Sequence, residues 1–220
     1  MDKWNASGVI TMTTDFGHKG PFAAVMTGVI IKRFPAARII DLAHDIPAHW
    51  PPEAGFWISR SYGYFPEGTV HIAIVDPGVG TERDIIIAVR DGHVFMAPDN
   101  GLLDPLLGEA DRVCKLDLSS LSRFGLDAPS LTFHGRDIFA PLAAELAAGR
   151  ISVDEIASDT SDWTPGWLDE PEVSADKVLG IVVTIDAFGN LITNIDASLV
   201  EGMQDPIVEL GGHRIETVSY

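Results

Sequence analysis

The stretch VHIAIVDPGVGTER, residues 70–83, decides the fold of this chain. Its first six residues form an apolar run that predicts a buried strand. The run ends on Asp76, Pro77 and two glycines, and Arg83 follows seven positions after the aspartate. We therefore expect a strand whose end turns sharply and brings a cation back beside a carboxylate.

Strand-like and helix-like segments alternate on both sides of this stretch. Apolar patterns predict strands at 8–14 and 38–42. They predict helices at 21–34 and 51–65. Asp91-Gly92, between two apolar runs, predicts a hairpin. A further helix is expected over 136–150, with Pro141 either bending it or lying in its first turn. This alternation predicts an α/β domain with a mainly parallel sheet.

The character of the sequence changes after the last of these helices. Residues 1–155 carry the α/β pattern and form the expected N-terminal domain. Residues 156–177 are polar and acidic, contain two prolines and predict a linker. From 178 to 220 the pattern indicates strands and turns without a helix, so we expect a smaller β-rich C-terminal domain.

Composition and charge restrict the class of protein. A chain of 220 residues that is 46% hydrophobic and 21% charged is typical of a globular protein. Its net charge of -17 argues against nucleic acid or an anionic membrane as a partner. The single cysteine, Cys114, excludes an internal disulfide and is expected in the core. The N-terminal MDKWNASG does not resemble a signal peptide, and no apolar run is long enough for a membrane span, so we expect a cytoplasmic protein.

Four predicted strands end on or just before an aspartate, namely Asp15, Asp41, Asp76 and Asp99. In open α/β sheets, ligands bind at the carboxyl ends of the strands. Three of these aspartates have a glycine within two residues, which allows backbone and ligand to approach closely. Aspartate is also a common turn and cap residue, and we keep that interpretation for Asp41. Taken alone, such carboxylates are also compatible with a magnesium-dependent phosphohydrolase.

His134 is a second candidate, because it lies between Phe133 and Gly135 at the start of a predicted helix. A lone histidine is more often structural, but a histidine in a tight turn beside an aromatic residue and a glycine favours a site. The neighbouring Arg136-Asp137 pair is compatible with a cap or an ion pair that has no role in catalysis.

Six motifs follow one another in a distinctive order: TTDFG (13–17), DLAHDIP (41–47), FPEGTVHIAIVDPGVGTER (65–83), APDNGLL (97–103), TFHGRDIFAP (132–141) and DAFGNLITNI (186–195). This series resembles the S-adenosyl-L-methionine hydroxide adenosyltransferases, which are related to the fluorinating and chlorinating enzymes that use the same substrate. The likeness covers nearly the whole chain, and VDPGVGT and TFHGRD are its most specific parts. The resemblance implies hydrolysis of S-adenosyl-L-methionine to adenosine and L-methionine, with no cofactor and no metal.

The resemblance also implies an architecture and a set of site residues. The family has an α/β N-terminal domain and a smaller β-barrel, and forms homotrimers with the site between subunits. It places the catalytic triad on Asp76, Arg83 and His134. It assigns substrate binding to six further residues, Asp15, Phe16, Phe133, Asp186, Phe188 and Asn190. Relatives usually continue beyond the position of Tyr220, so we expect a C-terminal domain that is incomplete relative to the family.

Several alternatives stay open at this point. Either Asp76 or His134 can be the group that takes the proton from the attacking water. In a third alternative no side chain takes a proton, because the site captures hydroxide from solvent. A halogenase is disfavoured because such enzymes lack the aspartate and histidine of this triad. The fluorinating enzymes also carry a long insertion before the APDNG motif, where this chain has only the short hairpin Asp84–Pro98. A protein that binds S-adenosyl-L-methionine or adenosine without catalysis is the other alternative. Gly20 and Thr27 replace an acid and a lysine found in many relatives.

Overall fold

The computed structural model describes residues 4–126, 128–203 and 206–215. The chain divides into two compact units, Met1–Trp167 and Leu168–Tyr220. The division falls inside the range 156–177 that the sequence predicts as a linker.

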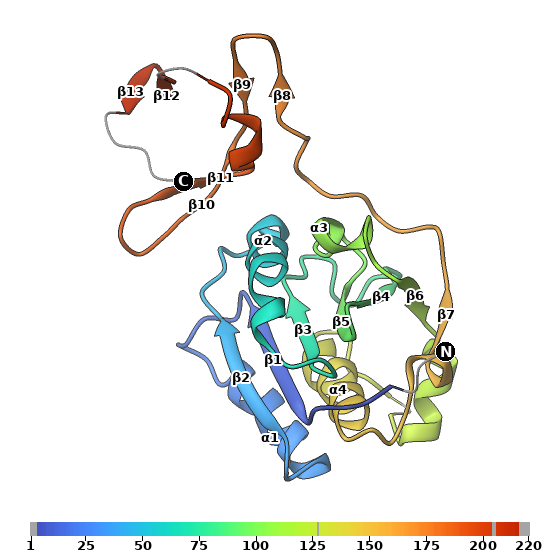
Figure 1. Cartoon of the computed structure of the whole chain (residues 1–220). Helices are drawn as coiled ribbons and strands as arrows, with labels where there is room; N and C mark the ends of the chain where they lie inside the picture. The colour runs from blue at the N-terminus through green and yellow to red at the C-terminus, as the bar shows by residue number, and fades with distance from the viewer. Residues whose placement is uncertain (1–3, 127, 204–205, 216–220) are drawn as a thin grey trace. The chain divides into compact units, whose positions relative to one another are not determined.

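A seven-stranded sheet forms the centre of the first unit, in the order β2-β1-β3-β5-β4-β6-β7 (Figure 1). The strands are β1 (Val9–Thr14), β2 (Arg38–Ala43), β3 (Val70–Ile74), β4 (Ile85–Arg90), β5 (His93–Pro98), β6 (Arg112–Leu116) and β7 (Ala157–Asp159). Strand β1 pairs in parallel with β2 and β3, and β3 pairs in parallel with β5. Strand β4 is antiparallel to both β5 and β6, so only β4 and β7 run against the common direction. The predicted α/β fold with a mainly parallel sheet is confirmed.

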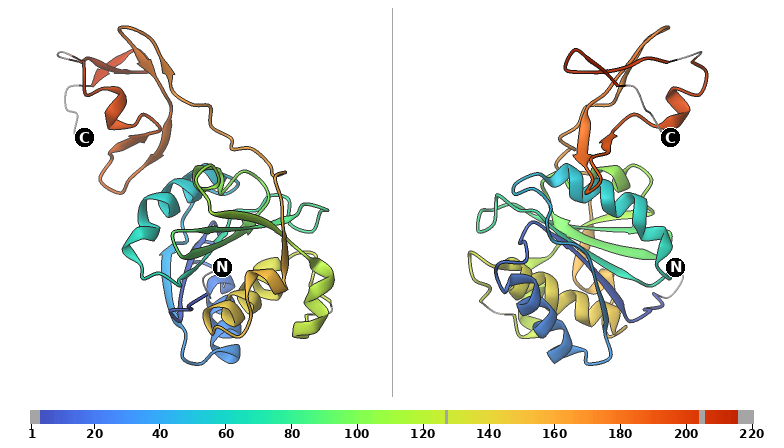
Figure 2. Two further views of the ribbon diagram at one scale, coloured as in Figure 1. Left: turned by 45° about the vertical axis from the view of Figure 1, so that its right-hand side comes forward. Right: turned by 90° about the vertical axis from the view of Figure 1, so that its left-hand side faces the viewer.

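Helices cover both faces of this sheet (Figures 1 and 2). Helices α1 (Phe22–Arg33) and α4 (Ala140–Ala147) pack together on one face. Helices α2 (Pro51–Ser61) and α3 (Asp104–Leu107) lie on the other. In the part of the chain that the structure describes, no helix has the length and apolar character to cross a bilayer.

The central strands are apolar throughout because both of their faces are buried. On β3 and just after it, Ile72 and Ile74 belong to the core beneath α1 and α4, whereas Ala73 and Val75 belong to the core beneath α2. Successive side chains of a strand point to opposite faces, so burial on both sides requires a continuous apolar run. Cys114 is fully buried in the first of these cores, as predicted.

Two local predictions are confirmed in detail. Asp91 and Gly92 connect β4 and β5 with φ values of 49° and 73°, the left-handed backbone of a tight hairpin turn. Pro141 lies in the first turn of α4, one of the two positions expected for it. A π-helical turn, η3 (Gly135–Phe139), precedes this helix.

Strand β7 lies within the range 156–177, where the sequence predicts only a linker. It pairs antiparallel with β6 at the edge of the sheet, and two of its three residues are exposed. A short polar edge strand has the composition of a loop, so its pattern gives no strand signal.

The described residues of the second unit form hairpins and no α-helix, in agreement with the prediction of a β-rich domain. Its ladders pair β8 (Glu172–Val173) with β9 (Val178–Leu179), β10 (Val182–Ile185) with β11 (Leu191–Thr193), and β12 (Val208–Leu210) with β13 (His213–Ile215). Among the described residues these remain three separate two-stranded sheets.

The packing of α2 yields a test of the fold. A Cβ atom on Gly55 would lie 2.2 Å from the backbone oxygen of Leu102, so Gly55→Ala forces the helix away from its neighbour. We expect this substitution to lower the free energy of unfolding by roughly 1–3 kcal/mol, measured by chemical denaturation. Gly28→Ala in α1 is the matched control, because nothing lies within 4 Å of its added Cβ. It should raise the free energy of unfolding by up to about 1 kcal/mol, and equal effects of the two substitutions would contradict this packing.

Candidate active site

An ion pair between Asp76 and Arg83 lies directly after β3. The Nε atom of Arg83 donates to both carboxylate oxygens of Asp76, at 3.0 and 2.9 Å, and Nη2 donates to Oδ2 as well. The side chains are only 4% and 10% exposed. Such a side-on pairing fixes both groups in one orientation. The sequence VDPGVGTER therefore returns a cation to the carboxylate at the strand end, as its pattern predicts.

The glycines of this loop have a geometric function. Gly80 has a φ of 81°, and a Cβ atom there would lie 2.2 Å from the backbone oxygen of Leu131. The loop therefore touches the segment before His134 so closely that only glycine fits. The N–H of Gly78 donates to Oδ1 of Asp76 at 3.2 Å and helps to orient the carboxylate.

His134 completes the cluster from a distant part of the chain. It is the residue before the π-helical turn η3, and its Nδ1 lies 3.1 Å from Nη2 of Arg83. A guanidinium has only donors, so Nδ1 of His134 accepts this hydrogen bond. The neutral imidazole then carries its proton on Nε2. Turns of π-helix are frequent at functional sites, and this one places the histidine beside Arg83.

The surroundings keep His134 in its neutral form. Burial and the positive charge of Arg83 lower the pKa of His134 below its usual value of 6.5. Protonation of Nδ1 would also remove its hydrogen bond with Arg83. The ring is therefore a neutral group with an N–H to donate.

A cavity of about 300 Å³, which we call the front cavity, lies against one side of this cluster. Its walls include five of the six residues of the first unit that the family resemblance assigns to the site, all but Arg83: Asp15, Phe16, Asp76, Phe133 and His134. The rings of Phe16, Phe22 and Phe133 contact one another edge to face or tilted, with centroids 5.5–5.9 Å apart. The cavity thus combines two carboxylates and an imidazole with an aromatic wall, which suits a flat polar ligand.

Asp15 is the second carboxylate of the front cavity, at the carboxyl end of β1. Burial raises the pKa of Asp15 above its usual value of 3.8, and the charge of Asp76 acts in the same direction. The N–H of His49 donates to Oδ2 of Asp15 at 3.3 Å. His49 has a φ of 64°, an unusual conformation for a residue with a side chain. This backbone donor aims the carboxylate, leaving an oxygen to accept hydrogen bonds from a ligand.

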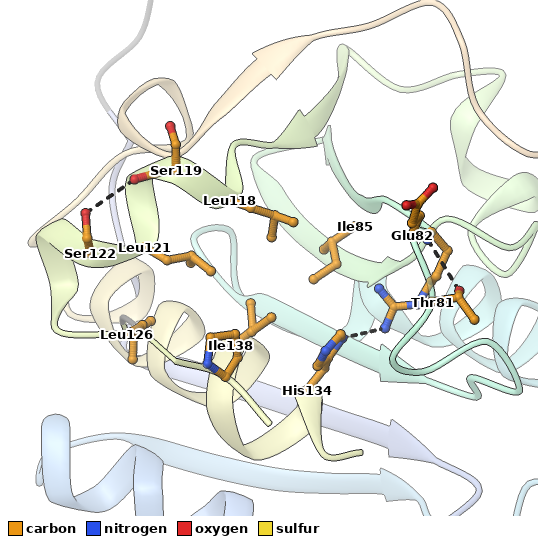
Figure 3. Close-up of a pocket in the computed structure, with 12 residues that line it drawn as sticks. Thr81, Glu82, Ile85, Leu118, Ser119, Leu121, Ser122, Leu126, His134 and Ile138 are labelled. Atoms are coloured by element: carbon orange, nitrogen blue, oxygen red, sulfur yellow. Dashed lines mark hydrogen bonds between the residues drawn. The ribbon is translucent and has the colours of Figure 1, made fainter. Parts of the chain in front are cut away.

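A second cavity, which we call the rear cavity, has a volume of about 420 Å³. It is lined by Arg83 and His134 together with apolar side chains, among them Ile85, Leu118, Leu121 and Ile138. In Figure 3, these apolar side chains lie between Ser122 on one side and His134 on the other. His134 is the residue that both cavities share.

The structure separates the other sequence candidates from this cluster. Asp99 lines neither cavity, and its Oδ1 accepts a hydrogen bond from the N–H of Thr164 at 2.8 Å. It anchors the end of the first unit, so its expected place in the site is wrong. Arg136 and Asp137 form an ion pair, and Asp137 also holds the N–H of Ser130, consistent with a structural role.

Asp186, Phe188 and Asn190 belong to the second unit, at the turn between β10 and β11. Asp186 accepts hydrogen bonds from the N–H groups of Phe188 and Asn190, each at 2.9 Å. The side chain of Phe188 is 91% exposed. The three residues therefore form one hydrogen-bonded turn that presents an exposed aromatic ring.

Sequence reasoning missed several residues around the front cavity. Phe22 and Val79 line it, and His49 orients Asp15 through a backbone group. An aromatic residue at a helix start and a valine between glycines give no functional signal. A backbone N–H carries no sequence signal at all.

In the described ranges of the chain, no three His, Cys, Asp or Glu side chains are grouped so that they can hold a metal ion.

Comparisons with known proteins place this geometry in a family. Residues 10–157 match the model of the SAM hydroxide adenosyltransferase N-terminal domain. A relative from Salinispora tropica, named (R)-S-adenosyl-L-methionine hydrolase, is 38% identical over 87% of this chain and 74% of its own length. A fluorinase from an Actinoplanes species is more distant, with 25% identity over 90% of this chain and 74% of its own. A crystal structure of an uncharacterized conserved protein from Thermotoga maritima matches with a TM-score of 0.84 and 33% identity. It covers 94% of this chain and 80% of that one.

Proposed function

Because this chain belongs to the SAM hydroxide adenosyltransferase family, we propose that it hydrolyses S-adenosyl-L-methionine to adenosine and L-methionine. The single observation that carries the proposal is the cluster of Asp76, Arg83 and His134 at the wall of a cavity with an aromatic side. The carboxylate of Asp15 binds the ribose hydroxyls, and Phe16 and Phe133 pack against the substrate.

The reaction needs little from the protein beyond position. The oxygen of water or hydroxide forms a bond to the ribose C5′ while the bond from C5′ to sulfur breaks. The electron pair of that bond stays on sulfur, so the sulfonium leaves as the neutral thioether of methionine and needs no general acid. When water is the nucleophile, one proton is released. The requirement is an oxygen held in line with carbon and sulfur, in a site that excludes other water.

The hydrogen bonds of the triad favour the capture of hydroxide over removal of a proton by a side chain. Arg83 and Gly78 already occupy the oxygens of Asp76, and Arg83 occupies Nδ1 of His134. Neither group has the free lone pair that a general base needs. Nε2 of His134 instead donates a hydrogen bond to the nucleophile, and the charge of Arg83 stabilises it.

A hydrolase is a better assignment than a halogenase for a physical reason. The carboxylate of Asp76 is 4% exposed and lines the front cavity. A halide ion desolvated beside this carboxylate would meet a like charge in a medium of low dielectric constant. A neutral water molecule that enters the site meets no such repulsion.

Assembly and conditions complete the proposal. The enzyme acts as a homotrimer in the cytoplasm, with the turn of Asp186, Phe188 and Asn190 closing the site of a neighbouring subunit, and it uses no cofactor or metal. Support comes from the exposed apolar side chains of that hairpin, Phe188 at 91% and Ile185 at 60%, which favour burial against another surface. Their acidic neighbour Asp186 suits the amine of the substrate.

The proposed reaction predicts equal amounts of adenosine and methionine from S-adenosyl-L-methionine, measured by liquid chromatography in the presence of a chelator. Asp76→Ala should lower turnover by roughly a hundredfold or more, because Arg83 loses the partner that orients it. Asp41→Ala is the control, since this strand-end aspartate lines neither cavity and is 58% exposed. Loss of activity with the chelator would favour a metal-dependent hydrolase, and binding without products would favour a non-catalytic binder.

The assigned role of His134 predicts a distinct pH dependence. Because the pKa of His134 is lowered, the ring stays neutral until the pH falls below 6.5. Turnover in the wild type should therefore decline on the acid side with a midpoint below pH 6.5, as the imidazole gains a second proton and loses its bond to Arg83.

His134→Asn separates a hydrogen-bonding role from a base. The amide retains an acceptor for Arg83 and an N–H donor but cannot take up a proton near neutral pH. We expect it to keep at least about tenfold more activity than His134→Ala and to lack the acidic decline. Equal loss in both variants would identify His134 as the proton acceptor.

A further inference from the structure

The triad forms a partition between two cavities. Asp76 lines the front cavity, Arg83 lines the rear cavity, and His134 lines both. Since Nη2 of Arg83 contacts both Asp76 and His134, the three side chains form one continuous hydrogen-bonded wall. A molecule in the rear cavity can therefore reach the triad from the side away from Asp15 and the aromatic rings.

The rear cavity has a buried apolar floor and an exposed mouth. Ile85, Leu121 and Ile138 are 2%, 3% and 1% exposed, whereas Leu118 at the mouth is 56% exposed. Leu118 begins the 3₁₀ helix η2 (Leu118–Phe124), and in Figure 3 its side chain points toward Ile85 and into the cavity. A volume of about 420 Å³ is room for on the order of ten water molecules.

We propose that the rear cavity is a solvent-binding site that delivers water or hydroxide to the triad while S-adenosyl-L-methionine fills the front cavity. This inference rests on the proposed hydrolysis. An in-line displacement needs its nucleophile on the face of C5′ opposite to sulfur, and a bound substrate closes the front cavity to solvent. The rear cavity supplies a second approach that bypasses the substrate.

The side chains that line the rear cavity favour water or hydroxide as its occupant over a larger ligand. The cationic Arg83 is offset by the adjacent Glu82, which also lines the cavity, so no strong field selects a charged organic molecule. Apolar walls bind water weakly, so water passes through to the donors at the inner end. When water is the nucleophile, the proton released by the attack leaves to solvent along the same path.

The single cysteine of the chain makes this proposal testable by selective labelling. Cys114 is fully buried and burial raises the pKa of its thiol to about 11, so it reacts slowly with thiol reagents. We would introduce Leu118→Cys and label it with a benzyl methanethiosulfonate, which forms a mixed disulfide and releases a sulfinate. The bulky group then obstructs the mouth of the rear cavity, and a reducing agent removes it.

Labelled and unlabelled Leu118→Cys are compared at saturating substrate. We expect labelling to lower kcat about tenfold or more with KM within about twofold, and the reducing agent to restore kcat. Tyr64→Cys is the matched control, because Tyr64 is 90% exposed and lies in η1 (Tyr62–Tyr64), before the amino end of β3. Its labelling should leave both constants unchanged.

Complete labelling, verified by mass, with an unchanged kcat would overturn the proposal, because water would then arrive by another route. A rise in KM at constant kcat would also overturn it, because the rear cavity would then belong to the substrate site.

A second measurement does not depend on turnover. Diethyl pyrocarbonate can acylate Nδ1 of His134 whenever its hydrogen bond with Arg83 opens. With adenosine in excess in the front cavity, the reagent reaches the ring through the rear cavity, so the label on Leu118→Cys should slow this modification, followed by mass spectrometry. A rate that the label does not change would overturn the inference. Absence of adenosine formation by the wild type, with modification still blocked by the label, would instead count against the proposed hydrolysis alone.

Discussion

The side-on ion pair of Arg83 with Asp76 is the interaction on which the rest of the site depends. It closes the loop that follows β3, holds the carboxylate at the wall of the front cavity and leaves one N–H of Nη2 for His134. Removing one partner of a buried pair leaves an uncompensated charge and typically costs about 3–5 kcal/mol. The glycines of the loop serve the same interaction, because the return of the chain requires the close approach of Gly80 to Leu131.

The pair also determines where protons can lie. Arginine has no acceptor, so its contact with Nδ1 makes His134 a donor through Nε2. A site organised in this way stabilises an oxygen nucleophile rather than removing its proton. This arrangement fits a reaction whose leaving group departs as a neutral thioether. It also holds the carboxylate in a fixed position at the cavity wall, since the guanidinium links Asp76 to His134.

Much of the fold and part of the site can be predicted from the sequence because the signals are local. Burial on both faces makes β3 a continuous apolar run, and Asp91-Gly92 specifies its hairpin through backbone conformation. The carboxyl ends of parallel strands meet at one edge of a sheet, so Asp15 and Asp76 converge. The same rule of strand ends wrongly predicts that Asp99 belongs to the site. Local sequence does not reveal that the N–H of Thr164 donates a hydrogen bond to its carboxylate.

The remaining features depend on contacts between distant segments. The π-helical turn beside His134, the backbone donor of His49 and the partition between the two cavities arise from packing that no short pattern specifies. Strand β7 exists because the edge of β6 offers it hydrogen bonds, although its own residues resemble a loop.

The central claim, that the triad aims a solvent oxygen at the ribose C5′, is tested most directly by an isotope. The protein would convert S-adenosyl-L-methionine in water enriched in oxygen-18, and mass spectrometry would locate the label in each product. We expect one heavy oxygen in the 5′-hydroxyl of adenosine and none in methionine. Adenosine without the label, or the label in methionine, would contradict the account.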